Sequence, residues 1–187
     1  MTSFAPASSA TDVWAAIPTP FTPSQALDEV GLRRNAQRYM AVGLRGVFCN
    51  GLMGEVWALS NSERRRVVEV LVDEGKGRLG VSTVISASSM EETLELGLHA
   101  KKVGAEHAVL MVPTSGPRSD EQQLAYFRHI CERLDMPVVI FNSATAAGSP
   151  LKPEVFAQLC ELPRLKILKT TAYAENEALR RAARNGV

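Results

Sequence analysis

The sequence has little cysteine, little histidine and almost no net charge. Its three cysteines, Cys49, Cys131 and Cys160, lie far apart and form no Cys-x-x-Cys pair, which argues against a disulfide framework or a zinc site and fits a reducing cytoplasm. The histidines show no metal-ligand spacing. Twenty-one Lys and Arg against 20 Asp and Glu give a formal net charge of +1, so no overall field favours nucleic acid or an anionic membrane. The composition therefore predicts a cytoplasmic protein without a metal ion.

Long apolar runs and leader-like segments are missing as well. No run approaches the roughly 20 apolar residues of a membrane span. Residues 1–11 are small and polar, without the basic start and apolar centre of a signal peptide, and we expect residues 1–12 to form a flexible tail. In a chain of 187 residues with 45% hydrophobic content, residues 13–187 are enough for a single domain with one core.

The rest of the chain alternates short apolar runs with helical patterns. Buried strands are predicted at 14–17, 46–51, 79–85, 108–112, 137–142 and 165–171. Helices are predicted at 29–43, from a Ser60–Glu63 capping box onward, and at 89–103, 119–134, 152–161 and 175–184. Continuous Val, Ile and Leu runs are typical of a parallel sheet covered by helices. This pattern allows either a barrel or an open sheet, but neither glycine-rich nucleotide-binding motif is present.

Lys169 stands at the end of the last apolar run, Leu165-Lys166-Ile167-Leu168-Lys169. The carboxyl ends of parallel strands are where α/β barrels collect their reactive groups. A lysine with a pKa near 10.4 is neutral in only about one molecule in 2500 at pH 7, so a nucleophilic lysine needs apolar surroundings. This run fits either a Schiff-base lysine or a surface lysine that closes a strand.

Two arginine runs, Arg64-Arg65-Arg66 and Arg180-Arg181, fall within predicted helices. We expect both to be solvated helix faces.

Five groups of residues at the predicted strand ends carry a family resemblance. They are Thr19-Pro20-Phe21; Gly51-Leu52-Met53-Gly54-Glu55 with Leu59-Ser60 and Glu63-Arg64; Pro113; Phe141-Asn142 with Gly148; and Lys169. In order and separation they resemble the pyruvate-dependent class I aldolases and dehydratases that include dihydrodipicolinate synthase and N-acetylneuraminate lyase. The likeness covers roughly Val13 to the C-terminus. It implies an α/β fold of the (β/α) TIM-barrel type, commonly assembled as tetramers of paired dimers.

The resemblance also implies a chemistry. Lys169 would form a Schiff base with a 2-oxo acid such as pyruvate, with no other cofactor, and an aldehyde would be the second substrate. Thr19 would be a second catalytic residue, or else a turn residue held between prolines. Substrate binding would fall to Gly51, Leu52, Met53, Gly54 and Phe141. We expect Glu55 to cap backbone N–H groups, and Asn142 either to bond a neighbouring loop or to shape its own.

Several positions depart from the family's usual pattern. Leu52 and Met53 replace a hydroxyl-bearing pair, and Phe141 replaces the tyrosine that usually moves protons beside the lysine. Ala146 and Ser115 stand where dihydrodipicolinate synthase has an arginine and a dimer-crossing tyrosine. We therefore expect a lyase other than true dihydrodipicolinate synthase, acting on a more apolar substrate.

Length is a further departure, because a complete barrel needs about 250 residues. The chain supplies about six of eight β/α units and is interpreted as a fragment, a shortened homologue or one part of an assembly. Its first and last strands would expose open edges, so we expect a homo-oligomer or a partner chain to cover them. The alternative function is a non-catalytic binding or scaffold subunit that keeps Lys169 by descent. An unrelated open-sheet protein is the third possibility.

Overall fold

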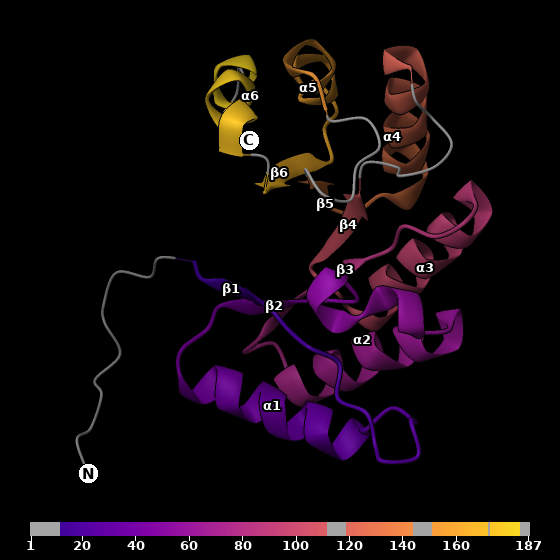
Figure 1. Cartoon of the computed structure of the whole chain (residues 1–187), viewed down its shortest axis with the longest axis vertical. Coiled ribbons are helices and arrows are strands. Elements are labelled where there is room, and N and C mark those ends of the chain that lie inside the picture. The colour runs from indigo at the N-terminus through magenta and orange to yellow at the C-terminus, as the bar shows by residue number, and fades with distance from the viewer. Residues whose placement is uncertain (1–11, 112–118, 144–150, 172, 184–187) are drawn as a thin grey trace. The chain divides into compact units, whose positions relative to one another are not determined.

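The computed structural model describes residues 12–111, 119–143, 151–171 and 173–183. Nearly all of the predicted tail, together with Pro113, Ser115, Ala146 and Gly148, lies outside these ranges. The chain divides into two compact units, which are described one at a time. The first consists of Met1–Thr83 and Val103–Ala105, and the second of Val84–Lys102 and Glu106–Val187 (Figure 1).

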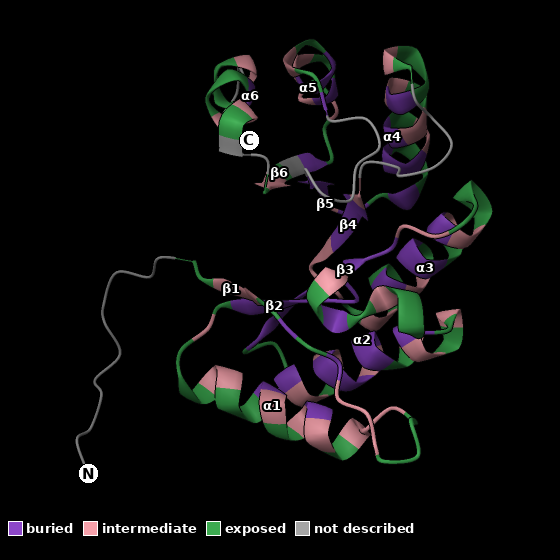
Figure 2. Cartoon of the chain, viewed as in Figure 1, coloured by how far each residue is buried: buried purple, intermediate pink, exposed green. Residues whose placement is uncertain are grey.

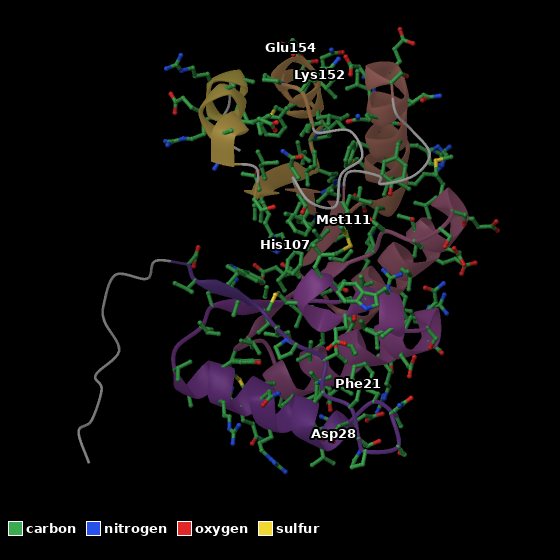
Figure 3. The ribbon with its side chains drawn as sticks, in the orientation of Figure 1. Phe21, Asp28, His107, Met111, Lys152 and Glu154 are labelled. Atoms are coloured by element: carbon green, nitrogen blue, oxygen red, sulfur yellow. The ribbon has the colours of Figure 1, made fainter. Side chains whose placement is uncertain are left out.

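The first unit contains three parallel strands and two long helices. β1 (Trp14–Ala16) pairs with β2 (Gly46–Cys49), which pairs in turn with β3 (Gly80–Val84). α1 (Glu29–Ala41) follows β1, and α2 (Asn61–Gly75) follows β2. The loop between β1 and α1 carries Phe21 and Asp28 (Figure 3). Asp28 caps α1, because its Oδ1 accepts a hydrogen bond from the Gly31 N–H at 2.9 Å.

α2 begins at the predicted capping box. The Ser60 side chain accepts from the Glu63 N–H while the Glu63 carboxylate accepts from the Ser60 N–H. One face of α2 is apolar and buried. Every residue of β2 and β3 is buried as well (Figure 2). The buried residues of this core are Ile17, Leu32, Ala36, Val47, Cys49, Val67, Val68, Val70, Leu71, Leu79 and Val81.

The expectation that all of Arg64, Arg65 and Arg66 are solvated is wrong for Arg64. Its exposed fraction is only 5%, and its Nη1 donates to Asn61 Oδ1 at 3.3 Å. Helical spacing explains the error, because Arg64 lies three, four and seven residues before Val67, Val68 and Leu71 and so shares their buried face. Arg66 faces outward and bonds both carboxylate oxygens of Glu29 at 2.7 Å.

The second unit repeats the alternation. Its remaining strands are β4 (His107–Met111), β5 (Val138–Asn142) and β6 (Leu165–Thr170), and its helices are α3 (Met90–Val103), α4 (Asp120–Leu134), α5 (Pro153–Leu159) and α6 (Asn176–Ala182). β4 pairs with β5 and β5 with β6, both in parallel. Figure 3 marks the two ends of β4 with His107 and Met111, and the start of α5 with Lys152 and Glu154.

The helices of this unit pack closely over its strands. α4 begins at a second capping box, formed by Ser119 and Gln122. α5 contacts both α4 and α6. α3 approaches its neighbours at Gly97, where an added Cβ would stand 2.6 Å from a Leu134 methyl carbon, so only glycine fits there without a shift.

The predicted alternation of six strands and six helices is confirmed among the described residues. The strand order of the sheet follows the chain from β1 to β6. Within the described part of the chain, no helix combines the length and apolar character needed to span a membrane.

Leu71→Ala is expected to destabilise the first unit by about 2–5 kcal/mol, because it leaves a cavity in a fully buried position. Both tryptophans, Trp14 and Trp57, lie in this unit, so urea unfolding followed by tryptophan fluorescence reports on it. Val30→Ala on α1 is the control, because Val30 is 68% exposed and should change stability by no more than about 0.5 kcal/mol. Equal stability of the two variants would contradict the packing described here.

Candidate active site

Lys169 lies near the carboxyl end of β6, directly opposite Phe141 of β5. The two residues are register partners in the parallel ladder. The Lys169 Nζ atom stands 3.5 Å from the centroid of the Phe141 ring. Phe141 itself is only 2% exposed, and Lys169 is half-buried. The structure therefore brings together two of the residues that the sequence predicts for the site.

Burial lowers the pKa of the Lys169 ammonium from its ordinary value of 10.5. The physical cause is desolvation, which penalises the charged form of a buried amine. The Phe141 ring face attracts a cation and so acts in the opposite direction to this desolvation. At any given pH, more Lys169 is neutral, and thus nucleophilic, than in a solvated lysine.

Met111 extends the row of side chains across a third strand. It pairs with Phe141 in the β4–β5 ladder, so Met111, Phe141 and Lys169 stand at one level of the unit. The Met111 N–H donates to Ser86 Oγ at 2.8 Å, which anchors the end of β4. The neighbour of the lysine on this side is therefore the Phe141 phenyl ring, and the Met111 thioether lies one strand further away.

Two hydroxyl residues near the lysine were not predicted from the sequence. Thr171 Oγ1 donates to Ser143 Oγ at 3.4 Å, and Ser143 is buried. A signal for them exists in the chain, because each lies two residues beyond a predicted site residue, Phe141 or Lys169, and strand side chains repeat every second residue.

Asn142 bonds the chain segment that precedes α5. Its Oδ1 accepts from the Leu151 N–H at 3.4 Å, and its carbonyl accepts from the Thr171 N–H at 3.0 Å. It is completely buried. The side chain thus bonds within the connection that runs from β5 to α5, so of the two predicted roles, shaping its own loop is the one observed.

In the first unit, the segment Gly51–Gly54 forms a tight turn. Residues Leu52–Gly54 make a single 3-10 turn in which the Gly51 carbonyl accepts from the Gly54 N–H at 3.0 Å. Packing accounts for both glycines. A Cβ on Gly51 would stand 2.4 Å from a Phe48 ring carbon, and one on Gly54 would stand 3.2 Å from Thr19 Oγ1. Leu52 is half-buried on this turn, whereas Met53 is 64% exposed.

Thr19 contacts this turn directly. Its hydroxyl donates to the Gly54 carbonyl at 2.8 Å, and the side chain is 5% exposed. The structure thus brings Thr19 and Gly54 together within the first unit, as it brings Lys169 and Phe141 together within the second. The observed contact is structural, and a catalytic role for Thr19 remains a prediction.

The expectation that Glu55 caps backbone N–H groups is wrong. Glu55 precedes the 3-10 turn Val56–Ala58, but its side chain makes no capping hydrogen bond. Its backbone is left-handed, with φ of 53°, because the chain reverses between two consecutive 3-10 turns at this residue. The position is defined by backbone geometry, and the carboxylate is exposed.

The three cysteines are not activated as nucleophiles. Burial raises the pKa of Cys49 to about 12 and that of Cys131 to about 12, and it raises the pKa of Cys160 as well. All three thiols are free, and each is held in its protonated, weakly nucleophilic form. Among the described residues, no three His, Cys, Asp or Glu side chains gather as a metal site requires.

Comparison with known proteins places this arrangement in context. A model of the dihydrodipicolinate synthetase family matches residues 9–186. The 4-hydroxy-tetrahydrodipicolinate synthase of Methanopyrus kandleri is 36% identical over 147 residues, which are 78% of this chain and 49% of that protein. The N-acetylneuraminate lyase of Escherichia coli strain SMS-3-5 is 32% identical over 161 residues, 86% of this chain and 54% of that protein.

Solved structures agree. A crystal structure of dihydrodipicolinate synthase superposes with a TM-score of 0.85 at 26% identity, covering 91% of this chain and 60% of that one. The fold is that of a TIM barrel, and this chain supplies six of the β/α units, as predicted. The chain spans about half the length of the curated relatives it matches.

Thr19→Val is expected to lower the free energy of unfolding of the first unit by about 1–3 kcal/mol, because the buried Gly54 carbonyl loses its hydrogen-bond donor. Thr19→Ser is the matched control, since it keeps the hydroxyl and should retain most of the stability. Urea unfolding followed by tryptophan fluorescence measures both. A Thr19→Val variant as stable as the wild type would show that this contact contributes nothing.

The reactivity of Lys169 toward acetic anhydride is expected to rise with pH through a midpoint below 10.5. The sign follows from burial, which lowers the pKa and leaves the amine neutral at a lower pH than in a solvated lysine. Trace labelling at a series of pH values, with mass spectrometry for each peptide, gives the midpoint. Peptides with the exposed Lys101 and Lys152 normalise the reagent. A midpoint at or above 10.5 would contradict the assigned direction.

Proposed function

Because the chain belongs to the dihydrodipicolinate synthetase family, we propose that Lys169 forms a Schiff base with a 2-oxo acid such as pyruvate in a class I lyase reaction. The family resemblance of the sequence is thereby confirmed, and the family consists of pyruvate-dependent Schiff-base lyases. The observation that carries the proposal is the position of the Lys169 Nζ, 3.5 Å from the centroid of a buried phenyl ring and with its pKa lowered by burial.

In the proposed reaction the neutral amine attacks the ketone and loses water to give an iminium. The iminium is an electron sink, so it lowers the free energy of a carbanion at the adjacent carbon. That carbanion then adds to an aldehyde, or forms as an aldehyde leaves. The bond concerned is carbon–carbon in an aldolase and carbon–oxygen in a dehydratase.

The family resemblance implies that the Gly51–Gly54 turn of the first unit binds a substrate carboxylate, and this role stays a prediction. Since Leu52 and Met53 lack hydroxyl groups, backbone N–H groups of the turn must supply the hydrogen bonds. No described residue accepts a hydrogen bond from the N–H of Leu52 or Met53, which supports this role. Thr19 would then act mainly by holding the Gly54 carbonyl, and its part in catalysis remains a prediction.

The second substrate is proposed to be a more apolar aldehyde than those of the relatives with hydroxyl-rich sites. In the second unit, Met111 and Phe141 present a thioether and a phenyl group, and in the first unit Leu52 and Met53 are apolar as well. Such side chains stabilise apolar substrate atoms but leave polar ones without hydrogen bonds.

Location and assembly remain predictions. Three free cysteines fit a reducing compartment such as the cytoplasm. Ile167 of β6 is 40% exposed, an apolar side chain that a second copy or a partner chain would cover.

Sodium borohydride is expected to reduce a pyruvate adduct onto Lys169 in the wild-type chain, and Lys169→Ala is expected to lose that adduct completely. The reason is that only an iminium on this amine is reduced to a stable secondary amine. Mass spectrometry of proteolytic peptides locates the adduct across a small panel of 2-oxo acids.

Lys101→Ala is the matched control, because Lys101 is an exposed lysine of α3 that pairs with Asp135, and its loss should leave the adduct unchanged. A folded wild-type sample that forms no adduct with any acid of the panel would contradict the proposed function. That outcome would favour a non-catalytic homologue.

A further inference from the structure

Ser143 and Thr171 lie two residues beyond Phe141 and Lys169, just after the ends of β5 and β6. Phe141 pairs with Lys169 and Asn142 with Thr170, and the Thr171 N–H continues the ladder by donating to the Asn142 carbonyl at 3.0 Å. Side chains two residues apart on a strand project from the same face, roughly 7 Å apart. Ser143 and Thr171 therefore share the face that carries Phe141 and Lys169.

The two hydroxyl groups contact each other. Thr171 Oγ1 donates to Ser143 Oγ at 3.4 Å, and Ser143 is only 2% exposed while Thr171 is exposed. The buried serine oxygen thus holds an accessible threonine hydroxyl two residues beyond the lysine, on the same face. A hydroxyl both donates and accepts hydrogen bonds, so it can pass a proton between two atoms, whereas the phenyl ring of Phe141 can do neither.

We propose that the Thr171 hydroxyl is the proton-transfer group of the Lys169 reaction and that Ser143 positions it. The inference rests on the proposed function, because it names the residue that serves a Schiff base on Lys169. In this proposal the Thr171 hydroxyl touches the reacting 2-oxo acid. Ser143 does not touch the acid and acts only by holding Thr171.

Proton transfer by Thr171 accompanies the addition of the Lys169 amine to the ketone. The lone pair of Lys169 Nζ forms a bond to the ketone carbon, and the carbonyl π pair moves onto oxygen. One N–H proton passes to Thr171 Oγ1 while the threonine's own proton passes to the alkoxide, so the threonine is unchanged. A second proton, from water, makes that oxygen leave as water while the nitrogen lone pair forms the iminium. Loss of a C3 proton to water then gives the enamine and restores the proton count.

The test follows the exchange of pyruvate C3 protons for deuterium in D2O by NMR, which reports iminium and enamine formation without an aldehyde. Thr171→Val removes the hydroxyl at nearly constant shape and is expected to lower the exchange rate constant about tenfold or more. Thr171→Ser is the matched control and should exchange nearly as fast as the wild type. Ser143→Ala should lower the rate constant in the same direction but by less.

Two further readouts separate proton transfer from a structural role. The pyruvate concentration for half-maximal exchange should stay within about twofold in Thr171→Val, since ground-state binding is unchanged. The final amount of borohydride-trapped adduct should also be unchanged, because the relay alters a rate and not an equilibrium. Adding Phe141→Tyr to Thr171→Val should restore exchange, because a phenol supplies another proton-transfer group next to the lysine.

Failure of proton transfer by Thr171 can be told apart from failure of the Schiff base on Lys169. Suppose that borohydride traps the adduct on wild-type Lys169. Exchange by Thr171→Val at the wild-type rate, or by Thr171→Ser as slowly as by Thr171→Val, would then overturn the proton-transfer role of Thr171 and leave the Schiff base in place. A Thr171→Val variant with a weaker half-maximal concentration and an unchanged rate constant would make Thr171 a binding residue, which also overturns it. Absence of any adduct on wild-type Lys169 would sink the proposed function, and the relay with it.

Discussion

The parallel pairing of β5 with β6 is the interaction on which the candidate site depends. It places Lys169 opposite Phe141, and the half-buried amine then lies 3.5 Å from the centroid of a phenyl ring. Desolvation at that place lowers the pKa of the amine and so favours its neutral form. The same ladder, continued by one hydrogen bond from Thr171 to Asn142, carries two hydroxyl groups to the same face. A shift of this pairing by one residue would turn every one of these side chains to the opposite face.

The Gly51–Gly54 turn is held by packing. A Cβ on Gly51 would overlap the Phe48 ring, and one on Gly54 would make a tight contact with the Thr19 hydroxyl, while Leu52 and Met53 between them carry apolar side chains. The Phe141 ring has no hydroxyl with which to donate a proton, and its face lies next to the Lys169 amine. An apolar site of this kind raises the population of the nucleophile while leaving proton transfer to hydroxyl groups elsewhere on the strands.

Two residues show where local patterns mislead. Arg64 was expected in solvent as part of an arginine run, yet its helical phase places it on the buried face of α2. Glu55 was expected to cap backbone N–H groups, but its side chain makes no capping hydrogen bond and its backbone is left-handed between two 3-10 turns. In both cases the residue type suggested a role that the local backbone and packing do not give it.

The sequence by itself determined the alternation of strands and helices, the Ser60–Glu63 capping box and the family, because hydrophobic period, cap chemistry and strand-end motifs are local properties of the chain. It also singled out Lys169 and Phe141. Only the tertiary structure decided that Lys169 stands over the Phe141 ring, that Thr19 is bonded to Gly54, and that the hydroxyl groups of Ser143 and Thr171 are bonded to each other. These facts depend on strand register and on contacts between residues 28 to 35 positions apart, and no local pattern encodes a distance across the sheet.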